Sequence, residues 1–184
     1  MNGGDSPTLA HRAARNMGPV RLVRMGRQPA DREVLQRVLE GAPDYAMKVT
    51  GAPPAPGAAE SLLASLPEGM TYQDKFVFSL HAGDQVVGCA DVLRGYPVPE
   101  KATIGLLLIA ESYQGRGLGA AAYAELESRI RDWGCQTIRL AVVETNDQVL
   151  GFWEKAGFQP TGERRAYTAG SVQSELLVME KRLA

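Results

Sequence analysis

The order of apolar segments along the chain predicts an α+β fold, in which a mixed sheet of six or seven strands is flanked by helices. The run 102–109 is the most apolar segment, so we expect it to be a central strand covered on both faces. A glycine-rich turn, a helical pattern and a β-branched strand at 137–143 follow it. Together they predict one β-α-β crossover in the middle of the chain.

The chain before this crossover predicts three strands and two helices. The segment 20–25 predicts a short first strand, and Pro29 begins a helical pattern in which Asp31 could act as the cap. Its apolar stripe consists of Val34, Leu35, Val38 and Leu39. A second helix is predicted at 58–66, where Pro67 stops it. The next two predicted strands, 76–81 and 86–93, should form a hairpin.

The crossover helix and the segments after it complete the prediction. The crossover helix should pack one apolar face on the sheet, because its large residues recur at steps of three and four. These residues are Leu118, Ala122, Leu126, Ile130 and Trp133. A further helix is predicted at about 147–156, with Gly157 after its last residue. Segments 164–168 and 175–179 predict a closing hairpin.

Size and composition predict one globular domain. The chain has 184 residues, 45% of them apolar and 22% charged, with a net charge of −1. We expect a flexible arm at residues 1–18 and a single domain over residues 19–184. The small net charge argues against a nucleic-acid or membrane-surface binder. No apolar run approaches the ~18 residues of a membrane span, and no secretory apolar region is present, so we expect a cytoplasmic protein.

The cysteines and histidines predict neither a disulfide nor a metal site. Cys89 and Cys135 lie inside apolar segments, so we expect two buried free thiols in a reducing compartment. The chain has two histidines and no C-x-x-C pattern, which is too little for a histidine-based or cysteine-based metal site.

The segment 114–119, Gln-Gly-Arg-Gly-Leu-Gly, predicts an anion-binding site between the central strand and the following helix. Backbone N–H groups at a helix start have no partners within the helix and can point at one ligand. The helix dipole adds roughly half a positive charge there, and glycines let the backbone approach phosphate oxygens closely. We therefore expect a bound phosphate or pyrophosphate at residues 115–119.

Three glycine patterns compete for the identity of this phosphate ligand. A P-loop needs a Lys-Ser/Thr pair, which the chain lacks. A dinucleotide fingerprint is met by Gly115, Gly117 and Ala120, but the acidic residue expected about 20 positions later is absent, since Cys135 stands there. The third pattern, Gln/Arg-x-x-Gly-x-Gly/Ala, is met by Gln114, Gly117 and Gly119.

The third pattern resembles the acyl-CoA pyrophosphate loop of the GNAT superfamily of acyl-CoA-dependent N-acyltransferases. A second match lies downstream, where Asn146 precedes the segment 152–158, Phe-Trp-Glu-Lys-Ala-Gly-Phe. The resemblance extends from about residue 76 to residue 158. It implies a GNAT-like sheet with splayed central strands, acetyl-CoA as co-substrate, and direct attack on it by an amine acceptor.

The resemblance also implies roles for individual residues. The backbone edge of Leu107, Leu108 and Ile109 should bind the pantetheine arm, and the Leu108 N–H should polarise the thioester oxygen. The pyrophosphate should lie on the loop formed by Gln114, Gly115, Arg116, Gly117, Leu118 and Gly119. Asn146 should contact the pantetheine, or cap the following helix, or do both. Trp153 should form a wall of the pantetheine channel.

The catalytic acid and base are less clearly indicated. Trp153 stands where many family members have a tyrosine acid, and an indole N–H is not a usable acid. Substitute phenols are Tyr113, Tyr123 and Tyr167. Glu144, at a strand end beside Asn146, ranks first as general base, and the other candidates are Glu111, Asp91 and His81. An amine that is already neutral when it binds would need no base.

Two classes of function lead, and a nicotinamide-binding domain is a third. The first is an acetyl-CoA-dependent N-acetyltransferase acting on a primary amine of a small molecule or peptide, without a metal. The second is a non-catalytic acyl-CoA-binding or sensing module, favoured by the missing tyrosine. Asp44, Tyr45 and Met47, between the first two predicted helices, together with Tyr96 and Tyr167, could hold a cationic amine. A homodimer is possible.

Overall fold

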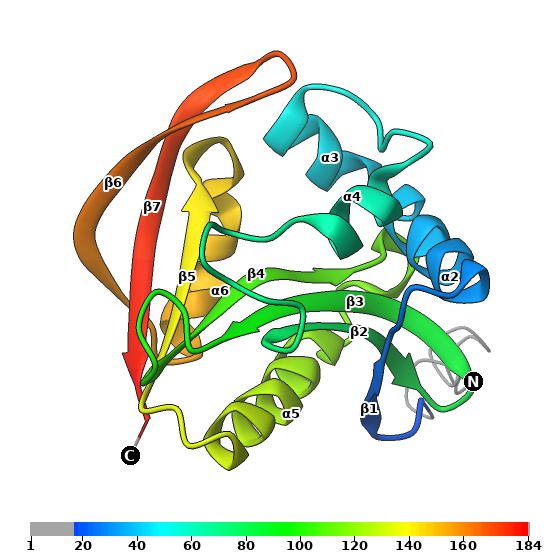
Figure 1. Ribbon diagram of the computed structural model, residues 1–184. Helices are drawn as coiled ribbons and strands as arrows, with labels where there is room; N and C mark the ends of the chain where they lie inside the picture. Colours follow the sequence, from blue (N-terminus) through cyan, green and yellow to red (C-terminus); the bar gives the residue numbers. More distant parts are fainter. Residues whose placement is uncertain (1–16, 184) are drawn as a thin grey trace, which may run out of the picture.

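The computed structural model describes residues 17–183, so the predicted arm at residues 1–18 lies almost entirely outside the described residues. One seven-stranded sheet with the order β1-β2-β3-β4-β5-β7-β6 forms the centre of the domain (Figure 1). Its strands are β1 (Val20–Arg24), β2 (Lys75–Ala82), β3 (Gln85–Arg94), β4 (Lys101–Ile109), β5 (Thr137–Val143), β6 (Gln159–Ala169) and β7 (Val172–Arg182). Only β4 and β5 run parallel, so the predicted mixed α+β sheet with one crossover is confirmed.

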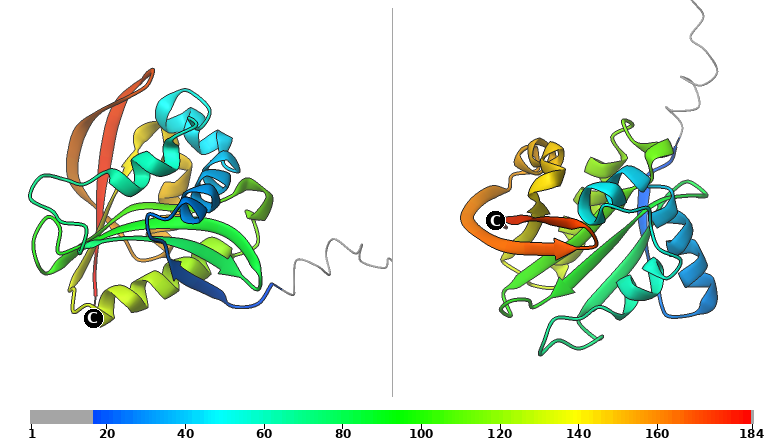
Figure 2. Two further views of the ribbon diagram at one scale, coloured as in Figure 1. Left: turned by 45° about the vertical axis from the view of Figure 1, so that its right-hand side comes forward. Right: turned by 90° about the horizontal axis from the view of Figure 1, so that it is seen from above.

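Helices cover both faces of this sheet (Figures 1 and 2). One face carries α2 (Pro29–Glu40), α3 (Pro43–Thr50) and α4 (Ala58–Ala64), and the other carries α5 (Leu118–Asp132) and α6 (Leu150–Lys155). Short 3₁₀ helices, η1 (Glu111–Tyr113) and η2 (Glu144–Val149), follow β4 and β5. None of the helices in residues 17–183 is both long and apolar enough to cross a bilayer.

The two faces have separate hydrophobic cores. Under α5, Leu126 and Ile130 are fully buried against side chains such as Phe78 of β2. Under α2, Leu35 packs with Cys89 of β3. Full burial of a leucine or isoleucine side chain contributes about 1.5–3 kcal/mol, so these contacts hold the helices on the sheet. Cys89 and Cys135 are both buried free thiols, as expected.

The N-terminal helical region differs from the prediction. Asp44, Tyr45 and Met47 were expected in a connecting segment, but they belong to α3, which starts at Pro43 and buries Ala46 and Val49. Between its flanking glycines the helix has only 8 residues, so its apolar period is too short to recognise in the sequence. The expected Asp31 cap is also wrong, because α2 already begins at Pro29. The Asp31 carboxylate instead accepts a hydrogen bond from the Gly26 N–H at 2.8 Å.

The parallel strands β4 and β5 separate after a few residues. Their last paired residues are Ile104 and Leu140, although β4 continues to Ile109 and β5 to Val143. A β-bulge accompanies this separation, because Asp91 of β3 pairs with Leu106 while the next residue of β3 pairs with Ile104. Position 105 is thus the extra residue of β4, and bulges bend a strand at such points. The splayed central strands are confirmed.

The β6–β7 hairpin extends past the end of β5 and contacts the end of α3 (Figure 1). The Tyr167 hydroxyl donates to the Val49 carbonyl at 2.9 Å, and the Ser171 N–H donates to the Thr50 carbonyl at 3.0 Å. Gly170 has a φ of +57°, and a Cβ placed on it would overlap the Thr50 carbonyl oxygen. Glycine at position 170 therefore permits backbone contact between the hairpin and α3, which ties the two remote segments together.

Candidate active site

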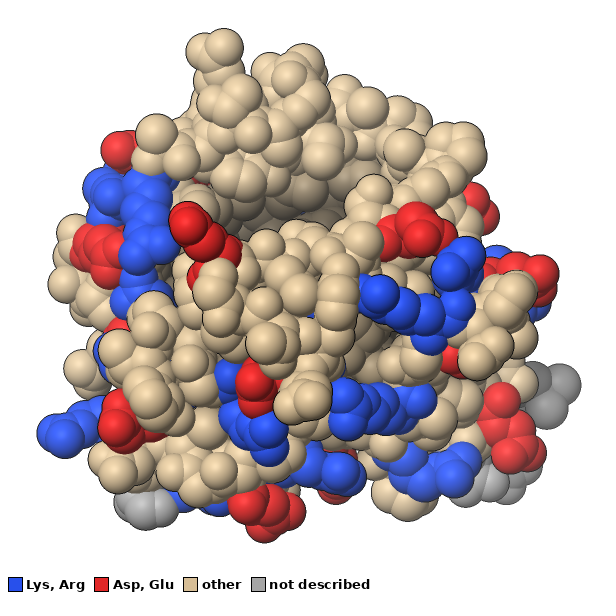
Figure 3. Space-filling view, viewed as in Figure 1, with Lys and Arg blue, Asp and Glu red and all other residues tan. Residues whose placement is uncertain are grey.

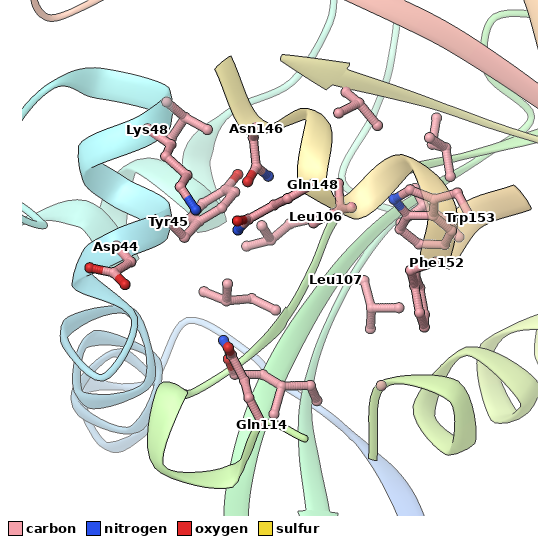
Figure 4. A pocket seen from close by; sticks show the side chains of 18 of the residues that line it. Asp44, Tyr45, Lys48, Leu106, Leu107, Gln114, Asn146, Gln148, Phe152 and Trp153 are labelled. Atoms are coloured by element: carbon pink, nitrogen blue, oxygen red, sulfur yellow. The ribbon is translucent and has the colours of Figure 1, made fainter. Parts of the chain in front are cut away.

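A cavity of about 610 Å³ passes through the gap between β4 and β5. Its walls include Leu106 on the α3 side of the sheet and Leu107 and Trp153 on the α5 side (Figure 4). Pairing of the two strands beyond Ile104 would close this passage, so the cavity exists because the strands diverge. It joins two openings of different chemistry.

The opening beside α5 is lined by unpaired backbone amides. Residues 115–117 form a turn, and α5 begins at Leu118. No carbonyl in the described part of the chain accepts the N–H groups of residues 115–120, and the first helical bond is from Ala121 to Gly117 at 3.1 Å. Gly117 has a φ of +78°, which points consecutive amides to one side. These donors, at the positive end of a helix dipole, form a site for an anion.

Most of the predicted site residues line this cavity. They are Leu107, Leu108, Ile109, Gln114, Gly115, Gly117, Leu118, Gly119, Asn146 and Trp153. Arg116 is not among them, because its guanidinium donates to the Ser112 carbonyl at 2.9 Å. Gln114 ties the loop to the end of β4 through a 2.8 Å hydrogen bond from its side-chain amide to the Ile109 carbonyl.

The edge of β4 that faces β5 carries free backbone groups. The Ala110 N–H donates to the Val87 carbonyl at 2.9 Å, and the register pairs Leu108 with Cys89 and Leu107 with Ala90. Residues of an antiparallel strand alternate in the direction of their backbone groups, so the Leu108 N–H points to β3. The N–H groups that face the cavity are therefore those of Leu107 and Ile109, the neighbours of the predicted donor.

Asn146 lies at the other wall of the gap, in a non-helical conformation within η2. Its residue surface is only 8% exposed, yet its side chain forms no hydrogen bond with the described residues. Neither η2 nor α6 has a side-chain cap, so the capping alternative is wrong. Its amide atoms are not among the fully enclosed polar atoms without a partner in residues 17–183, and the residue lines the cavity (Figure 4). Its hydrogen-bonding groups are left for a ligand.

Trp153 belongs to an aromatic cluster at the cavity wall beside α6. Its ring packs edge to face against Tyr123, Phe152 and Phe158, with centroid distances of 5.8, 4.8 and 5.2 Å. Burial raises the pKa of the Tyr123 phenol, and so does the neighbouring Glu127 carboxylate. This phenol is thus a weaker acid than an exposed tyrosine.

Glu144 lies outside the cavity wall. Its carboxylate accepts a hydrogen bond at 3.2 Å from Arg164, which also pairs with Glu175, and all three side chains are about half exposed. Glu111 does line the cavity, but one of its oxygens accepts the Asp44 N–H at the start of α3, at 2.7 Å.

The opening beside α3 contains residues that the sequence did not clearly indicate. Lys48 and Gln148 line it together with Tyr45, which was only a weak candidate (Figure 4). Burial raises the pKa of Tyr45 to about 12, with smaller contributions from Tyr167 and Cys89. Figure 3 shows a hollow on this face of the molecule, with acidic side chains on both of its margins. Asp44 and Glu111 supply negative charge and Lys48 supplies positive charge at this end, so it can bind a ligand through ion pairs and hydrogen bonds.

Comparisons with known proteins agree with this geometry. An acetyltransferase from Thermus thermophilus has 26% identity and a TM-score of 0.70, over 91% of this chain and 99% of that one. The ribosomal-protein-S18-alanine N-acetyltransferase of Escherichia coli has 16% identity and a TM-score of 0.65, over 90% and 94%. A Bacillus subtilis acetyltransferase solved in complex with CoA has 15% identity and a TM-score of 0.59, over 90% and 99%. At 16% and 15% identity, the last two similarities show a shared fold and nothing more.

A family model assigns the chain directly. The model described as the acetyltransferase (GNAT) family matches residues 52–158, which hold the splayed strands, the glycine loop and Asn146. The chain therefore belongs to the GNAT acetyltransferase family.

Proposed function

We propose that this protein transfers an acetyl group from acetyl-CoA to a primary amine of a small molecule or peptide, by direct attack of the amine on the thioester. The observation that carries the proposal is the cavity through the gap between β4 and β5. It has free amides for a diphosphate at one opening and a polar, acid-rimmed mouth at the other. Direct transfer requires two substrates to meet from opposite sides.

The chain offers CoA mainly backbone groups. The N–H groups of residues 115–120 would bind the diphosphate, with the Gln114 side chain holding the loop against β4. The free edge of Leu107 and Ile109 would hydrogen-bond the pantetheine amides in the manner of an added strand. The unpartnered Asn146 amide would bind the pantetheine from the β5 side. In this register, the polarising N–H for the thioester oxygen comes from Leu107 or Ile109.

The reaction then requires a neutral amine and a leaving thiolate. The amine nitrogen forms a bond to the acetyl carbon, and the C–S bond breaks to release CoA thiolate. The nitrogen then loses one proton, to the thiolate or to solvent, which gives the N-acetyl product. A thiol pKa of about 8.5 makes the thiolate a fair leaving group without an acid, which is compatible with Trp153 at the usual tyrosine position. Glu144 is hydrogen-bonded to Arg164, so it would have to break this contact before it could take a proton from the incoming amine.

A non-catalytic acyl-CoA-binding module is the second candidate. One observation favours it: the cavity wall near α6 is formed by Trp153 and Phe152, and neither side chain can supply an acidic proton to the leaving thiolate. Such a module would bind acetyl-CoA and release no thiol when amines are added.

Two measurements separate these functions. Calorimetry with CoA tests the shared binding site, and acetyl-CoA turnover with a panel of polyamines, amino acids and peptides tests transfer. We expect thiol release that depends on the amine and mass-spectrometric detection of the acetylated product. Tight CoA binding without amine-dependent thiol release would favour the binding module, and failure to bind CoA would contradict both functions.

A further inference from the structure

The floor of the cavity on the α3 side carries at most a methyl group where the central strands separate. Gly105 of β4 and Ala141 of β5 both line the cavity, and both are exposed although their strands lie inside the sheet. Gly105 is the extra residue of the β-bulge, so its backbone has no direct partner residue on β3. At this point no side chain of β4 separates the cavity from the residue next to Gly105.

The residue behind Gly105 is Asp91. Its Oδ2 atom lies 3.3 Å from the position that a Cβ on Gly105 would occupy. The carboxylate forms a two-oxygen contact with Lys75 of β2, with both distances 2.8 Å. The Lys75 side chain is 4% exposed and the Asp91 side chain 13%. The pair is thus almost buried, and the aspartate is its more accessible member.

We propose that Asp91 binds the ammonium group of the acceptor and takes its proton, with the space over Gly105 as the route of approach. This inference rests on the proposed function, because it assigns the base of the acetyl transfer. The sequence ranked Glu144 first as base and named Asp91 among the other candidates. Neither residue lines the cavity itself, but the Asp91 carboxylate, from β3, lies next to Gly105, which does line it.

The surroundings of Asp91 suit this role. A carboxylate can accept about four hydrogen bonds, so two from Lys75 leave capacity for an ammonium group. Burial raises the pKa of the Asp91 carboxyl, and the hydrogen bond and charge of Lys75 partly oppose this. Cys89 on the same face of β3 and Tyr45 from α3 are neutral at working pH, because burial raises the pKa of each to about 12. The charge balance at Asp91 is therefore set by Lys75 and the substrate.

The proton and electron pairs balance in this scheme. An N–H bond of the acceptor ammonium breaks as an O–H bond forms on Asp91, which leaves a neutral amine. The nitrogen lone pair then forms the C–N bond to the acetyl carbon, and the C–S bond electrons leave with the CoA sulfur. The acylated nitrogen loses its surplus proton to the thiolate or to solvent, which gives the neutral amide. The proton on Asp91 returns to solvent or passes to the thiolate, and the carboxylate is restored.

The main test is the pH profile of Asp91→Asn. At pH 7 we expect kcat/KM for the amine to fall about 100-fold, within the range for a lost general base. The deficit should shrink as the pH approaches the pKa of the free amine, because solvent then supplies neutral amine. The Kd for CoA should stay within about twofold, since the amides at residues 115–120 are unchanged.

Matched variants separate catalysis from structure. Asp74→Asn removes a carboxylate from another ion pair, with Arg94 at 2.7 Å, and should leave the pH profile unchanged. Gly105→Ala keeps the Lys75–Asp91 pair but crowds its access, so kcat/KM should fall about tenfold. If Asp91→Asn does not fold, the double variant Lys75→Gln/Asp91→Asn removes both charges together and should show the same pH-dependent deficit.

A binding measurement decides the inference even without turnover. In the CoA complex labelled with ¹³C-aspartate, addition of propylamine or putrescine should shift the Asp91 carboxyl resonance and leave that of Asp74 in place. No shift at Asp91, or a wild-type pH profile in Asp91→Asn, would overturn the inference. So would a larger pH-dependent loss in Glu144→Gln than in Asp91→Asn. If wild type acetylates no amine but the Asp91 resonance still shifts, the transferase proposal fails while Asp91 remains the amine site.

Discussion

The two ends of the cavity are built in different ways. The end beside α5 comes from one continuous segment, residues 114–120, and presents backbone amides. The end beside α3 combines side chains of α3 and η2 with the bulge of β4, and the β6–β7 hairpin supports it from outside through its contact with α3. At the α5 end, backbone N–H groups can bind a diphosphate in any sequence that forms the turn. At the α3 end, the side chains determine which acceptor can bind. We therefore expect changes at the first end to alter CoA affinity and changes at the second to alter use of the acceptor.

The largest effect should follow from Gly117→Val. A φ of +78° is strained for any L-residue, and the strain is largest for a β-branched one. The loop should therefore change conformation, so that its backbone N–H groups no longer point to one site. We expect CoA affinity, measured by calorimetry, to fall about 100-fold, or about 2.7 kcal/mol. The matched control is Gly134→Val at the other end of α5, where φ is +77° and added atoms also meet open space. Equal losses of CoA affinity in both variants would contradict the diphosphate site.

Gly170→Ala tests the acceptor end. The added Cβ overlaps the Thr50 carbonyl, so the hairpin should lose its contact with α3. We expect the free energy of unfolding in urea to fall by about 2 kcal/mol, since strain and overpacking each cost about 1–3 kcal/mol. The KM for the amine should rise while CoA affinity is preserved.

Gly162→Ala is the control for this change, because Gly162 also has a positive φ, of +82°, but faces open space. It should cost about 1 kcal/mol and leave the amine KM unchanged. A lower CoA affinity in Gly170→Ala would show that the two ends are not independent.

Trp153→Phe probes the boundary between the two ends. If the indole only walls the channel, kcat should stay within about threefold, and the smaller ring should cost about 1–2 kcal/mol of stability. Trp133→Phe is a matched control, because Trp133 packs on Phe76 at a centroid distance of 4.3 Å and does not line the cavity. A kcat that falls tenfold or more only in Trp153→Phe would assign the indole a direct part in transfer.

The smallest effect concerns Glu127, remote from both ends. Burial raises the pKa of its carboxyl, but hydrogen bonds from Lys181, Tyr123 and Arg131 outweigh burial and lower the pKa to about 2. Because folding lowers this pKa, the resulting stability is complete above about pH 4.5 and disappears as the pH falls toward 2. Glu127→Gln should lose about 1 kcal/mol at pH 7 and show a weaker decline of stability over that window. An unchanged acid-unfolding curve would contradict this linkage.

The same contrast explains what could be predicted from the sequence. The glycine loop, its helix and the apolar strand before it are local patterns, so the turn at residues 115–117 and the start of α5 at Leu118 were predictable. The splay after Ile104 was implied only through family resemblance, because strand pairing is a tertiary property. The approach of Asp91 to Gly105 depends on a bulge that no local pattern of residues 101–109 reveals. Likewise α3 is too short for its period to be recognised, so Lys48 was missed.

The two cysteines affect how transfer can be measured. Cys89 has no exposed surface and Cys135 only 6%, and burial raises the pKa of both thiols, that of Cys89 to about 12. Thiolates, not thiols, react with disulfide reagents, so the folded protein should be silent toward Ellman's reagent. Every thiol that the reagent detects during turnover would then come from released CoA. Release of CoA can therefore be followed continuously by colour, even at a high enzyme concentration at which reactive protein thiols would otherwise add to the signal.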